Sequence, residues 1–579
     1  MISLADQVNY SRISGLASGL DIDSIVKNMI KAESYRLNKY KQAQTKDEWK
    51  QDIYRTVNSD LGNFIVNTRK DLGLSSTTAT GININKSISS VTWVNKTTVS
   101  DETVLTATAN GDAAAGKYSV NVTKLATGVT AASSKAIVTS ADPTVKVGTA
   151  TKLSEINGIN IVSSDTITFY INGKEISGLT GDSTVQDLLN KVNQSSAGIK
   201  MTYDSGLGRF FIATTSTGSS YGFQVTSDKN RTTSISGTKA ENLFNALSLN
   251  INRSDGTVVT GNADNLKELN NGTDAIYDFA GATGLTSSSN QVTVNGINMD
   301  FKKTGSVTVS VETDIDTIVT KIKKFFEEDY NKLLDGLYAK INEKADRDYQ
   351  PLTDDQKEAM KDDDIKKWED KAKQGLLQND PTISSMLYSI RDMLYEPVSG
   401  VDSKYNTLYK IGIETKSYFD GGKPGQIEID EAKLRQALIE NPDAVMNVLF
   451  KNSDADYTNK SLTSSERSSI KEQTGIVGRI YNEIIFGIKG IVDQAGYGQE
   501  EDVLRSVRSN IFIDFVTERS SISYLSKDIT DLKKRIADEQ DSLKRKEDMY
   551  YQKFTAMEKA ISQMNSQSAW LAQQFGTGQ

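Results

Sequence analysis

Two amphipathic patterns, one at each end of the chain, restrict its fold more than any other feature. Between Asp21 and Leu72 apolar residues recur mostly at helical spacings, with Asp21 as the predicted N-cap, and from Leu525 to Phe575 they recur at steps of three, four or seven. A helix of about 50 residues is roughly 75 Å long. A terminal helix with such a stripe needs a partner, and the two ends can pair only if the chain returns to where it began.

The middle of the chain has a different character. From about residue 75 to residue 311 it is rich in Thr, Ser, Gly, Asn and Val. Its alternating runs are typical of short antiparallel strands, as in Tyr118–Val122, Thr166–Ile171, Asn290–Val294 and Ser306–Val311. Residues 165–216 predict a hairpin, a short helix and a second hairpin, with a tight turn at Asn172-Gly173 and a helix cap at Asp182 or Ser183.

Helical periodicity resumes at Asp316, with an apolar stripe through Phe325, Leu333 and Leu337 that Asp329 interrupts. We therefore expect an α+β multidomain protein. Long helices at the two ends would flank a middle region of short antiparallel strands.

The composition removes several classes of function. The 579 residues include no histidine and no cysteine, which excludes Ser-His-Asp, Cys-His and HExxH catalysis, disulfides and zinc–sulfur sites. Carboxylate-pair and Ser-Lys catalysis stay open, so the composition favours a non-enzymatic role without proving it. The net charge of -8 gives no attraction to phosphate backbones, so we expect no nucleic-acid partner. We also expect no membrane span and no cleaved signal peptide.

Three acidic clusters are candidate metal sites: Asp21/Asp23, Asp354/Asp355 and Asp362–Asp364. Consecutive aspartates point in different directions on a helix, and these clusters lack the alternating ligands and central Gly of calcium loops. We interpret them as solvated charged faces, and we expect no metal, no cofactor and no catalytic residue.

Several segments, taken in order, match one known family. The chain opens with ISGLASGLDIDSIV (Ile13–Val26) and ends with MEKAISQMNSQSAWLAQQFG (Met557–Gly576). Between them lie TDAIYDFAG (Thr273–Gly281), VSVETDIDTIVTKIKKFFEEDYNKLLDGL (Val309–Leu337) and IEIDEAKLRQALIENPDAVMNVLF (Ile427–Phe450). Together they resemble the bacterial flagellar filament-cap family, also called hook-associated protein 2.

The resemblance implies a homo-oligomeric lid at the distal tip of the flagellar filament. Such a lid prevents flagellin leakage and promotes flagellin folding and polymerisation, and so supports motility. The implied partners are other copies of the chain, flagellin, the hook-filament junction protein and a cytoplasmic export chaperone. The implied route is secretion through the flagellar type III pathway.

The resemblance also implies that long antiparallel terminal helices form a coiled-coil leg, with antiparallel β-rich head domains inserted between them. It implies a division into four parts. Residues 1–45 plus 535–579 would form the terminal leg helices, and residues 46–85 plus 310–534 a helical upper leg domain. Residues 86–130 plus 240–309 would form a β-rich head domain. Residues 131–239 would form the outermost α+β head domain, in which residues 165–216 are similar to the hook/flagellin insertion motif.

Assembly contacts are expected at apolar positions of the terminal helices: Leu16, Leu20, Ile25, Met29, Leu532, Ile536, Met557, Ile561, Met564 and Leu571. The charged insert 349–380, the oligomer order and the flagellins accepted stay open. Two alternatives also stay open: another flagellar axial protein, such as a hook-filament junction protein or flagellin, and a tip adhesin that binds a host surface. The start GLASGLDIDSIV and the passage from IEIDEAKL to NPDAVMNVLF favour the cap.

Overall fold

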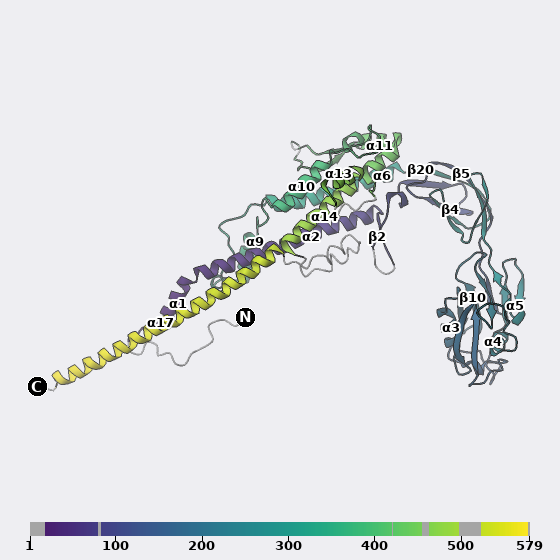
Figure 1. The fold of residues 1–579 in the computed structure, drawn as a ribbon, viewed down its shortest axis with the longest axis horizontal. Coiled ribbons are helices and arrows are strands. Elements are labelled where there is room, and N and C mark those ends of the chain that lie inside the picture. The colour runs from purple at the N-terminus through teal and green to yellow at the C-terminus, as the bar shows by residue number, and fades with distance from the viewer. Residues whose placement is uncertain are drawn as a thin grey trace. The chain divides into compact units, whose positions relative to one another are not determined.

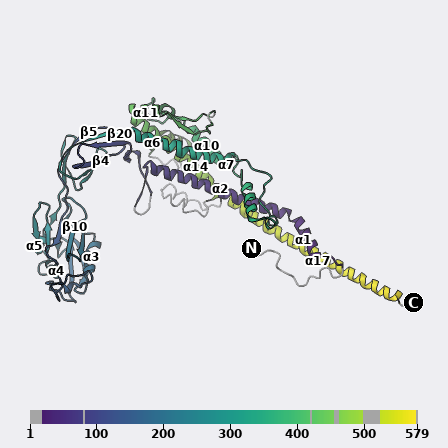
Figure 2. The same cartoon turned by 180° about the vertical axis from the view of Figure 1, so that it is seen from behind.

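The fold comes from a computed structural model, which describes residues 18–78, 83–417, 419, 421–453, 462–496 and 523–576. The chain divides into two compact units, shown in Figures 1 and 2. The helical unit combines Met1–Ile88 with Ile318–Gln579, and the β unit is the continuous stretch Ser89–Thr317. Helices and several antiparallel sheets together make the mixed α+β class that the sequence predicts, whereas the four-part division stays a prediction.

The helical unit is built mainly from helices that belong to both ends of the chain. They are α1 (Ile22–Glu33), α2 (Tyr35–Asp71), α6 (Ile315–Lys323), the π-helix η3 (Lys324–Tyr330), α7 (Asn331–Asn342), α8 (Asp354–Glu358), α9 (Asp362–Ala372), α10 (Pro381–Met393), α11 (Glu431–Glu440), α12 (Pro442–Phe450), α13 (Ser464–Gln473), α14 (Ile476–Ala495) and α17 (Tyr524–Gly576). Two small antiparallel pairs accompany them, β1 (Ser75–Thr77) with β2 (Asn83–Asn85) and β21 (Ile413–Thr415) with β22 (Ile427–Ile429).

Helix α14 lies at the centre of the helical unit and packs against α2, α10, α12 and α17. Its side chains are buried along most of its length. At its first turn the guanidinium of Arg479, which is 1% exposed, donates hydrogen bonds to the backbone carbonyls of Thr474, Glu396, Pro397 and Glu472 at 2.8 to 3.1 Å. A buried arginine is tolerated when its donors are satisfied in this way.

The sequence prediction for the helix from residue 316 is wrong in its phase between Phe325 and Leu337, whereas Leu337 itself is buried as predicted. The π-helix adds residues to one turn and so shifts the helical register. As a result, Phe326, Tyr330 and Leu334 become buried. Leu333 is only half-buried, and Asp329 stands off the stripe. The polar interruption seen in the sequence therefore marks a change of helix type.

The β unit contains two groups of sheets. The first group pairs a five-stranded sheet in the order β17-β16-β5-β20-β3 with a three-stranded sheet β18-β19-β4. These strands span β3 (Asn95–Val99), β4 (Leu105–Ala109), β5 (Gly116–Lys124), β16 (Ala275–Phe279), β17 (Ala282–Ser287), β18 (Gln291–Val294), β19 (Ile297–Phe301) and β20 (Gly305–Thr313). Their alternating apolar residues, such as Val120, Val122 and Val309, form one core.

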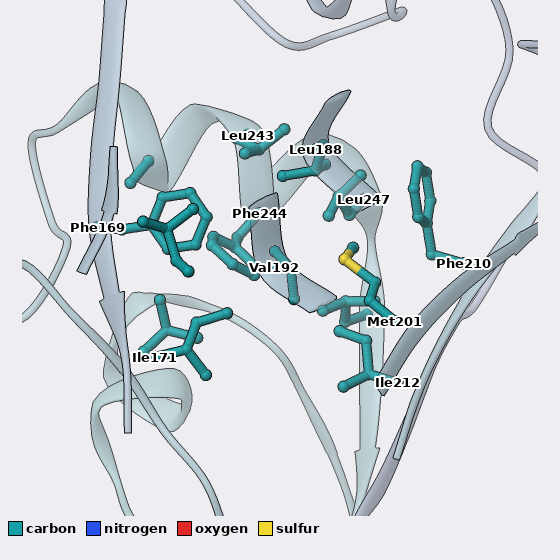
Figure 3. Close-up of a cluster of buried hydrophobic side chains, with 14 of the residues drawn as sticks. Phe169, Ile171, Leu188, Val192, Met201, Phe210, Ile212, Leu243, Phe244 and Leu247 are labelled. Atoms are coloured by element: carbon teal, nitrogen blue, oxygen red, sulfur yellow. The ribbon is translucent and has the colours of Figure 1, made fainter. Parts of the chain in front are cut away.

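The second group has a five-stranded sheet β14-β13-β6-β10-β9, a three-stranded sheet β12-β7-β8 and a pair β11-β15. Its strands are β6 (Thr130–Ser133), β7 (Thr166–Ile171), β8 (Lys174–Thr180), β9 (Ile199–Asp204), β10 (Arg209–Thr214), β11 (Gly222–Phe223), β12 (Val225–Thr226), β13 (Leu249–Asn252), β14 (Val258–Thr260) and β15 (Asn270–Asn271). Helices α3 (Val185–Gln194), α4 (Lys239–Leu247) and α5 (Ala263–Lys267) complete it. Figure 3 shows its core, where Phe169 and Phe244 meet edge to face with ring centroids 5.2 Å apart.

The hairpin–helix–hairpin order predicted for residues 165–216 is confirmed by β7-β8, α3 and β9-β10. Asn172 and Gly173 both take positive φ at the first turn. The predicted cap of α3 is wrong, because Thr184 is the N-cap and accepts a hydrogen bond from the Asp187 backbone N–H. The Asp187 carboxylate accepts a hydrogen bond from the Thr184 backbone N–H, so a capping box fixes the N-cap one residue after Ser183 and two after Asp182.

Close packing between α14 and α10 yields a prediction. A Cβ at Gly487 would overlap the Met386 side chain. We expect Gly487→Val to lower the free energy of unfolding by about 1–3 kcal/mol, measured by urea unfolding and circular dichroism. The control is Gly336→Ala in α7, where an added Cβ meets nothing within 4 Å and should stabilise by about 0.5–1 kcal/mol. Equal stability of the two variants would contradict the close approach of the helices.

Candidate functional site

The two ends of the chain lie side by side, and Figures 1 and 2 both show α17 along α1 and α2. Five sites of cross-contact set the direction of the pairing. Near the start of α17, Gln51 Nε2 donates to Ser526 Oγ at 3.0 Å, and Arg36 Nε lies 3.6 Å from a Glu539 carboxylate oxygen. In the middle, the Glu33 carboxylate accepts hydrogen bonds from Lys546 and Tyr550. Further along α17, Tyr551 Oη donates to Asp23 at 2.9 Å, and the Ser18 backbone N–H donates to Glu558 at 3.3 Å. The residue numbers fall on one helix as they rise on the other, so the helices are antiparallel.

Two polar residues that fall within the apolar stripe of α17 have partners across the pair. Glu539 and Lys546 interrupt the apolar stripe in sequence, yet they face Arg36 and Glu33 on the opposite helix. Hydrogen bonds from Lys546 and Tyr550 lower the pKa of the Glu33 carboxyl, and Glu33 in turn raises the pKa of both donors. The interruptions therefore fix the register of the pair rather than weaken a uniform seam.

The N-terminal residues predicted to make assembly contacts differ in exposure. Ile25 and Met29 are half-buried, and Leu20 is 45% exposed. Leu16 lies outside the described residues. The fully buried positions of α1 are instead Ile22 and Val26, which the prediction did not select.

The C-terminal candidates divide into two groups along α17. Leu532, Ile536, Met557 and Ile561 are half-buried. Met564 and Leu571 are 59% and 46% exposed, with Trp570 nearby at 56%. Among the described hydrogen bonds between the two ends, the one farthest along α17 ends at Glu558. The last turns of α17 thus present large apolar side chains beyond that contact.

The acidic clusters of the sequence have structural roles in the described residues. Asp21 caps α1, as predicted, by accepting from Ser24, and Asp23 accepts from Tyr551. Asp362–Asp364 occupy the first turn of α9, where negative charge favours a helix N-terminus. No group of three or more carboxylates that could hold a metal occurs within the described ranges.

A shallow polar depression of about 390 Å³ lies over β5, β16 and β20 in the β unit. Its lining includes Asn121, Asp278 and Ser306, which are hydrogen-bonded to one another through Asn121. These short side chains satisfy their polar atoms within the sheet and contain no nucleophile–base pair. The paired terminal helices are therefore the stronger candidate for the functional surface.

The fold and this surface define a class: a helical body closed by its own chain ends, with an inserted antiparallel β unit. Family models for the flagellar hook-associated protein 2 N-terminus and C-terminus match residues 18–129 and 272–566. The chain is 30% identical to a flagellar hook-associated protein 2 from Halalkalibacterium halodurans, over 98% of this chain and 100% of the relative. A relative of the same name from Thermotoga maritima is 23% identical over 98% of this chain and 96% of its own length.

The chain belongs to the flagellar hook-associated protein 2 family. It is also similar to the crystal structure of the flagellar cap protein FliD D1-D2-D3 domains from Escherichia coli, with 20% identity and a TM-score of 0.43, over 76% of this chain and 96% of that one. The two family models leave residues 130–271 unmatched. That interval contains the hairpin–helix–hairpin and its core. Within the described parts of the chain, no helix is long and apolar enough to cross a membrane.

The Glu33 cluster predicts a pH dependence of stability. Because the folded-state pKa of Glu33 is lowered, its stabilising contribution is complete above the ordinary glutamate pKa of about 4.3 and is lost as pH falls through the folded-state value. We expect Glu33→Gln to lower the urea midpoint at about pH 7, and we expect its difference from wild type to shrink as pH falls through the folded-state pKa of Glu33.

The control for this experiment is Asp531→Asn, which removes an exposed carboxylate from α17, the helix that pairs with α1. The control variant should show no such loss at about pH 7. A Glu33→Gln effect that keeps the same size throughout an acid titration would contradict the assigned role of the charge.

Proposed function

We propose that this chain caps the distal tip of the flagellar filament as a homo-oligomer, and that it prevents flagellin leakage and promotes flagellin folding and polymerisation during elongation. Membership of the flagellar hook-associated protein 2 family supports this function. The observation that carries the assembly role is the apolar surface of α17 at Met564, Trp570 and Leu571, because exposed large apolar side chains mark surfaces that contact other proteins.

The paired terminal helices would form the leg of the cap. In this proposal α1, the first half of α2, and α17 act as an antiparallel coiled-coil leg, and the β unit supplies the head. Half-buried positions such as Ile25, Met29, Leu532 and Ile536 would contribute to contacts with other copies or with flagellin. Contacts made by half-buried apolar residues among polar ones are individually weak. A cap that shifts its position while subunits are added requires weak contacts of this kind.

The proposed partners are other copies of this chain, flagellin, the hook-filament junction protein and a cytoplasmic export chaperone. Export would follow the flagellar type III pathway. The work is mechanical, with no bond made or broken.

Location on the filament tests the function as a whole. We expect labelled protein added to filaments of a strain that lacks this chain to mark distal ends only, by electron microscopy, and to reduce unpolymerised flagellin in the medium. Label along the whole filament would indicate a flagellin, and label at the hook boundary would indicate a junction protein. If the protein labelled the tip and bound host surfaces but left flagellin leakage unchanged, the result would favour the alternative that it is a tip adhesin.

The α17 surface can be tested directly. We expect Met564→Asp combined with Leu571→Asp to abolish swimming in the complemented deletion strain, because charge on the apolar stripe prevents docking. The helix content of the purified protein should not change, since both side chains are exposed.

The matched control is Ser562→Asp combined with Ser566→Asp, which adds the same charge on the opposite side of the helix at exposed positions. The control strain should swim. Wild-type swimming of the Met564/Leu571 variant would contradict the role of this stripe in assembly.

A further inference from the structure

The charged segment between α7 and α10, residues 344–378, lies against the terminal helices; we call it the strap. It contains α8 and α9, and Figure 1 shows α9 beside α2. Its base is closed: the Asn379 backbone N–H donates to the Ile341 carbonyl at 2.9 Å, and the Gly375 N–H donates to Glu343 at 3.1 Å. A Cβ at Gly375 would overlap the Ala345 backbone. The two ends of the strap therefore lie close together, beside the end of α7.

The strap is internally ordered. The rings of Tyr349 and Trp368 lie 4.5 Å apart, and the Trp368 indole N–H donates to the Gln350 carbonyl at 2.8 Å. Lys357 on α8 pairs with Glu369 on α9 at 2.7 Å. These contacts tie its two helices to each other, so the strap can transmit force between its base and the surface that it touches.

Polar contacts join the strap to α1 and α2. The carboxylates of Asp354 and Asp355 lie 2.6 and 3.0 Å from the ammonium groups of Lys41 and Lys31. Further along α2, three more pairs follow: Gln42 Nε2 donates to the Pro351 carbonyl at 2.7 Å, Lys46 donates to Gln350, and the Lys373 ammonium lies 5.1 Å from the centroid of the Trp49 ring.

The part of α2 that the strap contacts has little apolar support of its own. Among residues 35–50 of α2 only Leu37 is buried, whereas nine residues are buried between Gln51 and Asp71. Burial raises the pKa of the Asp47 carboxyl, and the like charge of Asp528 on α17 raises it further. Because apolar burial is the main stabilising term in packing, residues 31–49 depend on polar contacts to stay in place.

We propose that the strap is an electrostatic latch that holds residues 31–49 of α1 and α2 in place and that releases this segment when its ion pairs break. Asp354 and Asp355 act on the strap side, and Lys31 and Lys41 on the helix side. The latch would set the stiffness of the outer half of the helix pair without contributing to the core around α14. It is a property of the single chain and does not require the proposed capping function.

Hydrogen exchange of the full-length protein, read on peptides covering residues 31–49, tests the latch. Reversal of the strap charges by Asp354→Lys with Asp355→Lys should speed exchange of these peptides about tenfold, the effect of losing several surface ion pairs and hydrogen bonds together. Adding Lys31→Asp with Lys41→Asp to that variant should restore slow exchange, because opposite charges again face each other.

Glu358→Lys with Asp370→Lys is the matched control, since both residues are exposed on the strap and undergo the same charge change. It should leave exchange of residues 31–49 unchanged. In wild-type protein, about 1 M NaCl reduces the Debye length to about 3 Å and should speed exchange toward that of the strap variant. Peptides from α14 should stay protected throughout and so report that the helical unit is folded.

A second variant, with residues 346–374 replaced by Gly-Ser-Gly, removes the latch entirely and should show the same fast exchange of residues 31–49. Unchanged exchange in this variant, with α14 protected, would overturn the proposal. Failure of the double reversal to restore slow exchange would overturn it as well, even if the deletion variant did not fold. Both outcomes are independent of whether the protein caps filaments.

Discussion

The antiparallel contact between the two chain ends is the constraint on which the helical unit depends. Because α17 lies along α1 and α2, the chain that leaves the unit for the β unit, residues 89–317, has to return to it. Helix α14 makes this return stable, since it packs against both α2 and α17. The buried Arg479 then anchors the start of α14 to neighbouring carbonyls. One apolar helix thus joins segments that are hundreds of residues apart in sequence.

Stability is distributed unevenly along α2. From Gln51 onward its side chains enter the core around α14, where Phe64, Phe325 and Tyr481 pack ring against ring at centroid distances of 5.8 to 6.3 Å. Before Gln51 it is held by ion pairs and hydrogen bonds to α17 and the strap. Polar contacts of this kind break and reform locally at low cost, whereas core packing does not. The helix pair is therefore firm near α14 and more yielding away from it.

The sequence predicted the parts that depend on local pattern. The terminal helices, the Asp21 cap and the hairpin–helix–hairpin follow from spacing and turn chemistry, and the structure confirms them. The phase error between Phe325 and Leu337 arose because a π-helix leaves no signal in hydrophobic periodicity. Similarly, the stripe on α17 indicated that Leu543 and Leu571 belong to one face, but not that the first is buried and the second exposed. That difference depends on where the partner helix lies, which is information outside α17.

The division into an interrupted helical unit and a continuous β unit also has a consequence for the order of folding. Residues 89–317 contain every strand of the β unit, so this unit can fold as soon as its own stretch of chain is free. The helical unit needs α17 beside α2, a closure across more than 450 residues, and contacts of such large sequence separation form slowly. When the chain is delivered from its N-terminus, α1 and α2 therefore lack α17 as a partner until the last residues arrive. The final step of folding is then the joining of the first segment to the last.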